Sequence, residues 1–279
     1  MRILVTNDDG VDSPGIVALA EALAATGHDI VVVAPATDRS GSSAAVGTLH
    51  RLEPMAVTPV EWPGLPDVRV LTVDTPPGMI VYAGCLGGFG DPPDVVVSGI
   101  NPGANTGHLV LHSGTVGAAL TAAGLGVPGL AVSIGFGRGP DSLNGDPEWC
   151  WDTAATLAVG ALDWVVEPEG GPRVLNLNAP NRPLSEVRGV REATLAPYGT
   201  VWAASADSGS GDLLLEFKGN DVEPDPDTDL ALVRNGYASV TPLVAMSRAP
   251  VDGAAATITR KVATSPEPLW RRRTGSIPK

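Results

Sequence analysis

Residues 2–35 decide the fold, and they read RILVTNDDGVDSPGIVALAEALAATGHDIVVVAP. Two runs of apolar residues, RILV and DIVVVAP, enclose a segment rich in Ala and Leu that has the length of a helix. Pro14 near the start of that segment and Gly27 just past its end are typical of helix boundaries. A strand, a helix and a second strand in this order predict two parallel strands joined by a crossover helix.

The same alternation of apolar runs and helix-length segments continues to about residue 134. Continuous apolar runs are typical of parallel strands that are buried on both faces. One more amphipathic helix and one more strand are expected before the pattern changes, at 148–166 and 172–180. The expected elements between residue 35 and that helix lie at 67–73, 76–88, 93–100, 114–126 and 128–134. The predicted fold class is therefore α/β, with a doubly wound and mainly parallel sheet.

After Pro183 the sequence breaks into short strand-like pieces separated by Asp, Gly and Pro, such as GDLLLEFKG (211–219) and GYASVTPL (236–243). This pattern predicts hairpins that project from the main sheet instead of continuing it. We expect residues 1–182 to form the core. Residues 183–279 are expected to form a C-terminal hairpin and oligomerisation region of the same domain, because their apolar pieces need a second subunit for burial.

Composition limits the possible functions. The chain has 279 residues, of which 43% are hydrophobic and 18% charged, as in globular proteins. No apolar run approaches the ~20 residues of a membrane span, and Met1 leads directly into a strand, so we expect a cytoplasmic location. The net charge of −13 argues against binding to nucleic acids or anionic membranes. The stretch DVEPDPDTD (221–229) is expected to be a solvated acidic loop.

Polar groups follow three of the expected strands, and a fourth polar stretch lies at the start of the helix that comes after the third of them. These stretches are NDDG (7–10), ATDRSGSS (36–43), SGINPGANTG (98–107) and HSGTVGAAL (112–120). Ligands of open α/β sheets bind beyond the carboxyl ends of the strands. We therefore expect all four stretches to meet in one crevice.

Asp8 and Asp9 are adjacent carboxylates, and such a pair costs free energy unless a cation or a proton lies between them. They could instead cap the helix that follows. If they bind a cation, oxygen ligands from carboxylate, hydroxyl and amide groups favour Mg²⁺, Mn²⁺ or Ca²⁺ over zinc.

Ser113, Gly114 and Thr115 open a helix after a glycine-rich loop, so their amides are suited to bind a phosphate. The alternative interpretation is that Ser113 and Thr115 only cap the helix. A hard cation beside a phosphate indicates a metal-dependent phosphoester enzyme. A dinucleotide-dependent oxidoreductase is disfavoured, because the first strand-to-helix turn lacks G-x-G-x-x-G.

Five stretches together closely resemble the SurE family, the stationary-phase survival nucleotidases, over roughly residues 1–245. They are ILVTNDDGVDSPGI, APATDRSGSS, PDVVVSGINPGANTG, SGTVGAAL and DTDLALVRNGYASVTPL. The resemblance implies a Rossmann-like catalytic core with a projecting C-terminal β-hairpin region, and assembly as homodimers or tetramers. It also implies metal-dependent hydrolysis of nucleoside 5'- and 3'-monophosphates. Two alternatives stay open: a phosphatase of another small phosphomonoester, and a nucleotide-binding protein that has lost turnover.

Transferred residue by residue, the resemblance implies a catalytic site at Asp8, Asp9 and Asn101. It assigns coordination of a divalent cation, Mg²⁺ or Mn²⁺, to Asp8, Asp9, Ser40 and Asn101. It places the phosphate against Asn105, Ser113, Gly114 and Thr115. The chain departs from the family at GANTGHLVLHSGTV, where His108 and Leu109 replace an acidic pair and His112 replaces a tyrosine. We interpret His108 and His112 as residues at the rim of the site, where they affect substrate preference.

Overall fold

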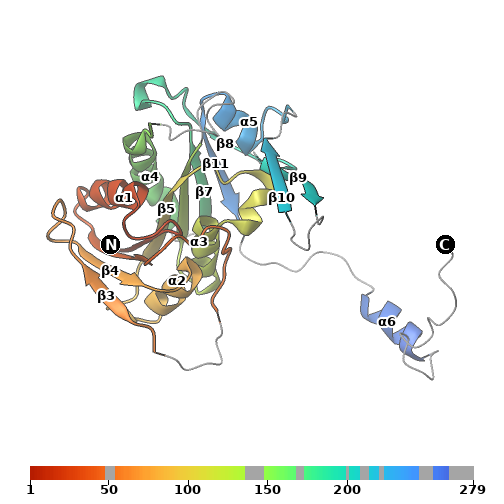
Figure 1. Cartoon of the computed structure of the whole chain (residues 1–279), viewed down its shortest axis with the longest axis horizontal. Coiled ribbons are helices and arrows are strands. Elements are labelled where there is room, and N and C mark those ends of the chain that lie inside the picture. The colour runs from red at the N-terminus through yellow and green to blue at the C-terminus, as the bar shows by residue number, and fades with distance from the viewer. Residues whose placement is uncertain are drawn as a thin grey trace. The chain divides into compact units, whose positions relative to one another are not determined.

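The computed structural model describes residues 1–47, 54–135, 148–167, 173–198, 201–207, 214–219, 223–244 and 254–263. The chain divides into two compact units, Met1–Ala245 and Met246–Lys279. The first unit holds the sheet and every residue of the candidate site (Figure 1). Of the second unit, helix α6 (Ala254–Ala263) is described. No helix in the described part of the chain is long and apolar enough to cross a membrane.

A nine-stranded sheet organises the first unit, with the strand order β3-β4-β2-β1-β5-β6-β7-β11-β8. The six strands from β4 to β7 in this order are parallel to one another, which confirms the predicted mainly parallel α/β fold. The strands are β1 (Arg2–Thr6), β2 (Asp29–Pro35), β3 (Val57–Val60), β4 (Arg69–Val73), β5 (Val95–Pro102), β6 (Gly129–Ile134), β7 (Val174–Ala179), β8 (Val190–Glu192) and β11 (Ala238–Leu243).

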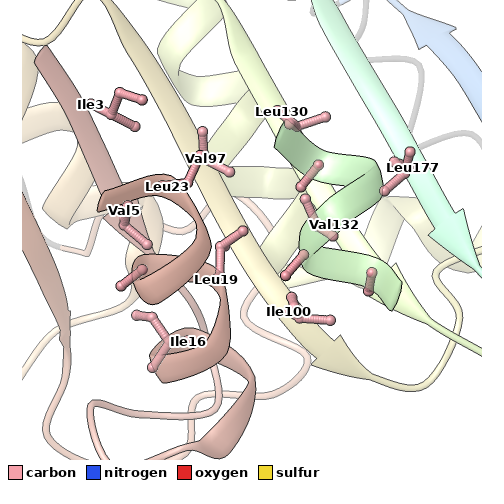
Figure 2. Packing of buried hydrophobic residues seen from close by; sticks show 14 of the residues in the cluster. Ile3, Val5, Ile16, Leu19, Leu23, Val97, Ile100, Leu130, Val132 and Leu177 are labelled. Atoms are coloured by element: carbon pink, nitrogen blue, oxygen red, sulfur yellow. The ribbon is translucent and has the colours of Figure 1, made fainter. Parts of the chain in front are cut away.

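Helices cover both faces of this sheet. Side chains of successive strand residues point to opposite faces, so neighbouring residues of β1 pack against different helices. Ile3 and Val5 of β1 pack in one apolar cluster with α1 (Pro14–Ala24) and α4 (Trp151–Val166), whereas Leu4 packs in a second cluster with α2 (Pro77–Cys85) and α3 (Gly114–Gly124). Figure 2 shows the first cluster, in which Ile16, Leu19 and Leu23 of α1 point at the sheet. The expected doubly wound arrangement is therefore present.

Strand β3 was not expected from the sequence. It pairs antiparallel with β4 at the edge of the sheet, and its residues are mostly exposed. Pro59 within it fits an edge strand, because an edge residue can lack a backbone donor without breaking the ladder. A strand of this kind has neither the apolar run nor the alternation by which strands are predicted.

The expectation that residues 236–243 project from the sheet is wrong. These residues contain β11, which pairs antiparallel with β7 and thereby continues the main sheet, and β8 then pairs parallel with β11. The expected hairpin is formed instead by β9 (Val201–Asp207) and β10 (Leu214–Gly219), which make an antiparallel sheet of their own (Figure 1). The grouping of residues 1–182 and 183–279 into one domain stays a prediction.

Candidate metal and phosphate site

Asp8 and Asp9 lie in a tight turn directly after β1. The Asn7 side chain closes this turn: its Nδ2 donates to the Gly10 carbonyl at 2.9 Å, and its Oδ1 accepts from the Gly10 N–H at 3.2 Å. Helix α1 starts only at Pro14, its first turn holds no acidic residue, and no side chain caps it. Asp8 and Asp9 therefore do not cap α1, and the turn presents them to the end of the sheet.

Asp8 is buried against the start of α3. Its side chain accepts a hydrogen bond from Thr115 Oγ1 at 2.6 Å, and the residue is only 3% exposed. A Cβ atom on Gly114 would lie 2.7 Å from Asp8 Oδ2, so glycine is what permits the helix to approach the carboxylate this closely. Burial raises the pKa of Asp8, while the hydrogen bonds from Thr115 and from the backbone lower it.

Asp9 has a carboxylate oxygen, Oδ2, that is buried and has no hydrogen-bond partner among the described residues. Burial, followed by the negative charges of Asp8 and Asp38, raises the pKa of Asp9 to about 7. A buried carboxylate oxygen without a donor is unfavourable unless a proton or a cation compensates it. The residues present therefore fit a bound cation.

Asn101 contributes an amide oxygen to the same cluster. Its Nδ2 donates to the Gly103 carbonyl at 2.6 Å, which leaves Oδ1 facing Thr115 Oγ1 at 3.5 Å. Thr115 therefore lies between Asn101 and Asp8. The pairing of β5 with β6 shifts register between Ser98 and Asn101, so this end of β5 departs from the regular ladder.

Ser40 lies in the loop after β2, and its side chain is exposed. Its backbone N–H donates to Asp38 Oδ1 at 2.7 Å. The loop itself is tied to the acidic turn, because the Arg39 N–H donates to the Asp8 carbonyl at 2.7 Å. Ser42 in this loop was missed by sequence reasoning: its buried Oγ lies 2.7 Å from the position of a Cβ on Gly114.

The four predicted cation ligands include only two carboxylates. In the described part of the chain, no group of three or more His, Cys, Asp or Glu side chains could hold a metal ion. A cation here would therefore depend on amide and hydroxyl oxygens in addition to Asp8 and Asp9. Such an all-oxygen set suits Mg²⁺ or Mn²⁺.

The side chains of Ser113 and Thr115 already have structural partners. Ser113 Oγ caps α3 by accepting from the Val116 N–H at 3.1 Å, so the capping interpretation is correct for this residue. The Thr115 hydroxyl instead donates to Asp8. The groups at this helix start that suit an anion are therefore the backbone N–H groups, which carry the positive end of the helix dipole.

Asn105 is fixed by two asparagines of β7. The Asn105 N–H donates to Asn178 Oδ1 at 2.8 Å, and its carbonyl accepts from Asn176 Nδ2 at 2.8 Å and Asn178 Nδ2 at 3.1 Å. Its own Nδ2 donates to Ser133 Oγ at 2.9 Å. Sequence reasoning missed Asn176 and Asn178, although two asparagines inside the apolar run VLNLNA are a signal for a polar task.

His108 and His112 lie on the 3₁₀ helix η1 (Gly107–His112), and both are exposed. Leu111 between them is 71% exposed. The Ser43 hydroxyl donates to the Leu111 carbonyl at 2.7 Å, so the loop after β2 contacts η1. Both histidines thus lie exposed on the segment that leads to Ser113, and their place at the rim of the site stays a prediction.

Comparison with known proteins shows the family of this chain. The family model of survival protein SurE matches residues 3–200. The 5'/3'-nucleotidase SurE of Serratia proteamaculans is 37% identical over 247 residues, which cover 87% of this chain and 90% of the relative. This chain belongs to the SurE family. The 5'-nucleotidase SurE of Ectopseudomonas mendocina is 39% identical over 247 residues, which cover 87% of this chain and 92% of that relative.

The SurE fold extends over most of the chain. The crystal structure of the SurE protein from Aquifex aeolicus matches with a TM-score of 0.68 and 29% identity, over 95% of this chain and 100% of that chain. The family match at residues 3–200 contains all eight predicted site residues, from Asp8 to Thr115. It ends before α5 (Asp229–Arg234), whose first residue accepts a hydrogen bond from the Gly107 N–H at 2.8 Å.

Proposed function

We propose that this chain is a cytoplasmic, divalent-metal-dependent phosphatase that hydrolyses nucleoside 5'- and 3'-monophosphates to nucleoside and phosphate. Membership in the SurE family and the names of its relatives support the substrate class. The observation that carries the chemistry is the pair Asp8 and Asp9: Asp8 is buried beside the start of α3, and a buried oxygen of Asp9 lacks a partner among the described residues.

Asp8, Asp9, Ser40 and Asn101 would hold the cation, Mg²⁺ or Mn²⁺. When bound, it supplies positive charge that neutralises the phosphate oxygens as negative charge develops on them. Thr115 supports this set, because its hydroxyl fixes Asp8 Oδ1 and lies near Asn101 Oδ1. Asn7 supports it from the other side by holding the acidic turn in shape.

The backbone amides of Gly114 and Thr115, at the start of α3, would bind the phosphate group. Gly114 also keeps this surface free of a side chain, so a phosphate can approach both the amides and the carboxylates. Asn105, which two asparagines of β7 hold in place, precedes this helix start in the glycine-rich segment 98–107. Because the start of α3 contacts the acidic turn at Asp8, the phosphate and the cation would share one small site.

A substrate panel tests the proposal. Phosphate release is measured from the 5'- and 3'-monophosphates of the common nucleosides and from p-nitrophenyl phosphate, with Mn²⁺ or Mg²⁺ and with excess EDTA. We expect turnover of nucleotides with either metal and its loss in EDTA. Activity that resists the chelator would contradict metal dependence. Tight nucleotide binding without any turnover would favour the alternative of a binding protein.

A further inference from the structure

Asp229 is a buried carboxylate that the proposed chemistry does not use. It is the first residue of α5 and is 0% exposed. Its Oδ2 accepts a hydrogen bond from the Gly107 N–H at 2.8 Å, and its Oδ1 accepts from the N–H groups of Ala196 at 2.9 Å and Leu230 at 2.8 Å. One carboxylate therefore joins three segments that are far apart in the sequence.

Gly107 has no room for a side chain at this contact. Its φ is +58°, and a Cβ atom would lie 2.2 Å from the Tyr198 carbonyl oxygen and 2.8 Å from the Ala196 carbonyl oxygen. The segment 194–198 is itself tied to α5, because the Asp229 N–H donates to the Thr194 carbonyl at 2.9 Å. Residues 194–198 and the start of α5 are thus bonded to each other, and both pack against Gly107.

Gly107 begins the short link to the phosphate site. Helix η1 starts at Gly107, Ser113 follows it, and α3 begins at Gly114. Upstream of Gly107, Asn105 is held independently by the two asparagines of β7. Loss of the contact to Asp229 would therefore loosen the link between Asn105 and Ser113, while the turn that carries Asp8 and Asp9 keeps its contacts through Asn7 and the Arg39 N–H.

We propose that Asp229 is a positioning residue for phosphate binding. By holding the Gly107 amide on the 194–198 segment, it sets the position of the 107–113 link and hence of the amides that open α3. The C-terminal part of the first unit thereby acts on the phosphate site without contacting the phosphate. This inference rests on the proposed function for its readout.

Asp229→Asn tests the inference, because it keeps the shape of the side chain but places an NH₂ group against a backbone N–H. The Michaelis constant for p-nitrophenyl phosphate, inhibition by inorganic phosphate and the affinity for Mn²⁺ are measured. We expect KM and the inhibition constant to rise about tenfold, in proportion to the loss of a charge-assisted hydrogen bond. The Mn²⁺ affinity should fall less than the phosphate affinity, because Asp229 contacts none of the cation ligands and Asn7 holds the acidic turn separately.

Thr228→Ala is the matched control. Thr228 caps α5 by accepting from the Ala231 N–H at 3.4 Å, and its hydroxyl donates to the Asp225 carbonyl at 2.6 Å. Its loss should lower the melting temperature and leave KM and phosphate inhibition unchanged. If Asp229→Asn behaves in the same way, Asp229 is only structural and the inference is wrong.

Gly107→Ala is the second probe, because it keeps the carboxylate and disturbs the packing of Gly107 on the Ala196 and Tyr198 carbonyls. It should reproduce the weaker phosphate binding, and it decides the matter if Asp229→Asn does not yield folded protein. If the wild type shows no metal-dependent turnover, the proposed function fails. Calorimetric titration of phosphate into the Mn²⁺-loaded proteins then still compares the variants, and equal affinities would overturn the role of Asp229.

Discussion

At the scale of single residues, Asp8 and Asp9 combine burial with like charge. Without a bound cation, burial raises the pKa of both, that of Asp9 to about 7. The native protein then binds protons more tightly than the unfolded chain, whose Asp residues titrate near the ordinary value of 3.8. The free energy of unfolding of the metal-free protein should therefore fall as the pH rises from about 4 to 7.

Asp9→Asn should remove much of this pH dependence. In excess EDTA at pH 8 we expect the variant to be more stable than the wild type by roughly 1 to 2 kcal/mol, because a buried charge is gone. At pH 5 the difference should shrink, since Asp9 is then protonated in the native wild type. Thermal unfolding at both pH values measures it. An equal difference at pH 5 and pH 8 would show that Asp9 does not titrate as described.

Gly114→Val should abolish hydrolysis of every phosphomonoester, including p-nitrophenyl phosphate. Its side chain would occupy the phosphate position, and its Cβ would lie 2.7 Å from both Asp8 Oδ2 and Ser42 Oγ, so Mn²⁺ affinity should fall as well. Gly124→Val, at the other end of α3, meets nothing within 4 Å and serves as the control. Hydrolysis of the generic substrate by Gly114→Val at the wild-type rate would remove Gly114 from the phosphate site.

At the scale of elements, η1 carries the chain's departure from the family pattern. His108→Asp restores an acidic residue on an exposed position of η1 and should change the ranking among nucleotides, because it acts on the leaving group. The rate on p-nitrophenyl phosphate should change less than about twofold. The ratios of kcat/KM across the substrate panel measure the effect. An equal loss on all substrates would place His108 in the phosphate site instead of at its rim.

Elements were predictable where apolar burial dictates the pattern. The strands from β1 to β7 on the parallel part of the sheet and helices α1 to α4 follow from continuous apolar runs and helix boundaries. The position of β11 was not predictable, because an antiparallel strand that joins a sheet edge has the same local pattern as a strand of a free hairpin. Pairing partners distant in sequence decide between the two.

The candidate site shows the same division. Asp8, Asp9, Asn101 and Thr115 follow strand ends or open a helix, and topology brings them together. Asp229 was assigned to a solvated acidic loop, which is wrong: it is buried and accepts three backbone hydrogen bonds. The acidic composition of its surroundings predicts an exposed charge. Its burial depends instead on the backbone N–H groups of Gly107 and Ala196, which are distant in sequence and which no local pattern reveals.

At the scale of the whole molecule, we predict a homo-oligomer, either a dimer or a tetramer. The edge strand β8, which begins at Val190, is exposed along its length, and Leu184 and Leu195 nearby in the sequence are also exposed. Exposed edges and apolar side chains favour association with another copy. Sedimentation velocity at micromolar concentration should show a species larger than the monomer. Monomer alone at that concentration would contradict the prediction.

The central claim is that Asp8 and Asp9 form a metal-dependent phosphatase site. Its most direct test is the turnover of a nucleoside 5'-monophosphate at saturating Mn²⁺ by the wild type, Asp8→Asn and Asp9→Asn, with circular dichroism to verify folding. We predict that each substitution lowers kcat by at least about 100-fold while the fold persists, because charge stabilisation at the phosphate is lost. Full metal-dependent turnover by both folded variants would contradict the account.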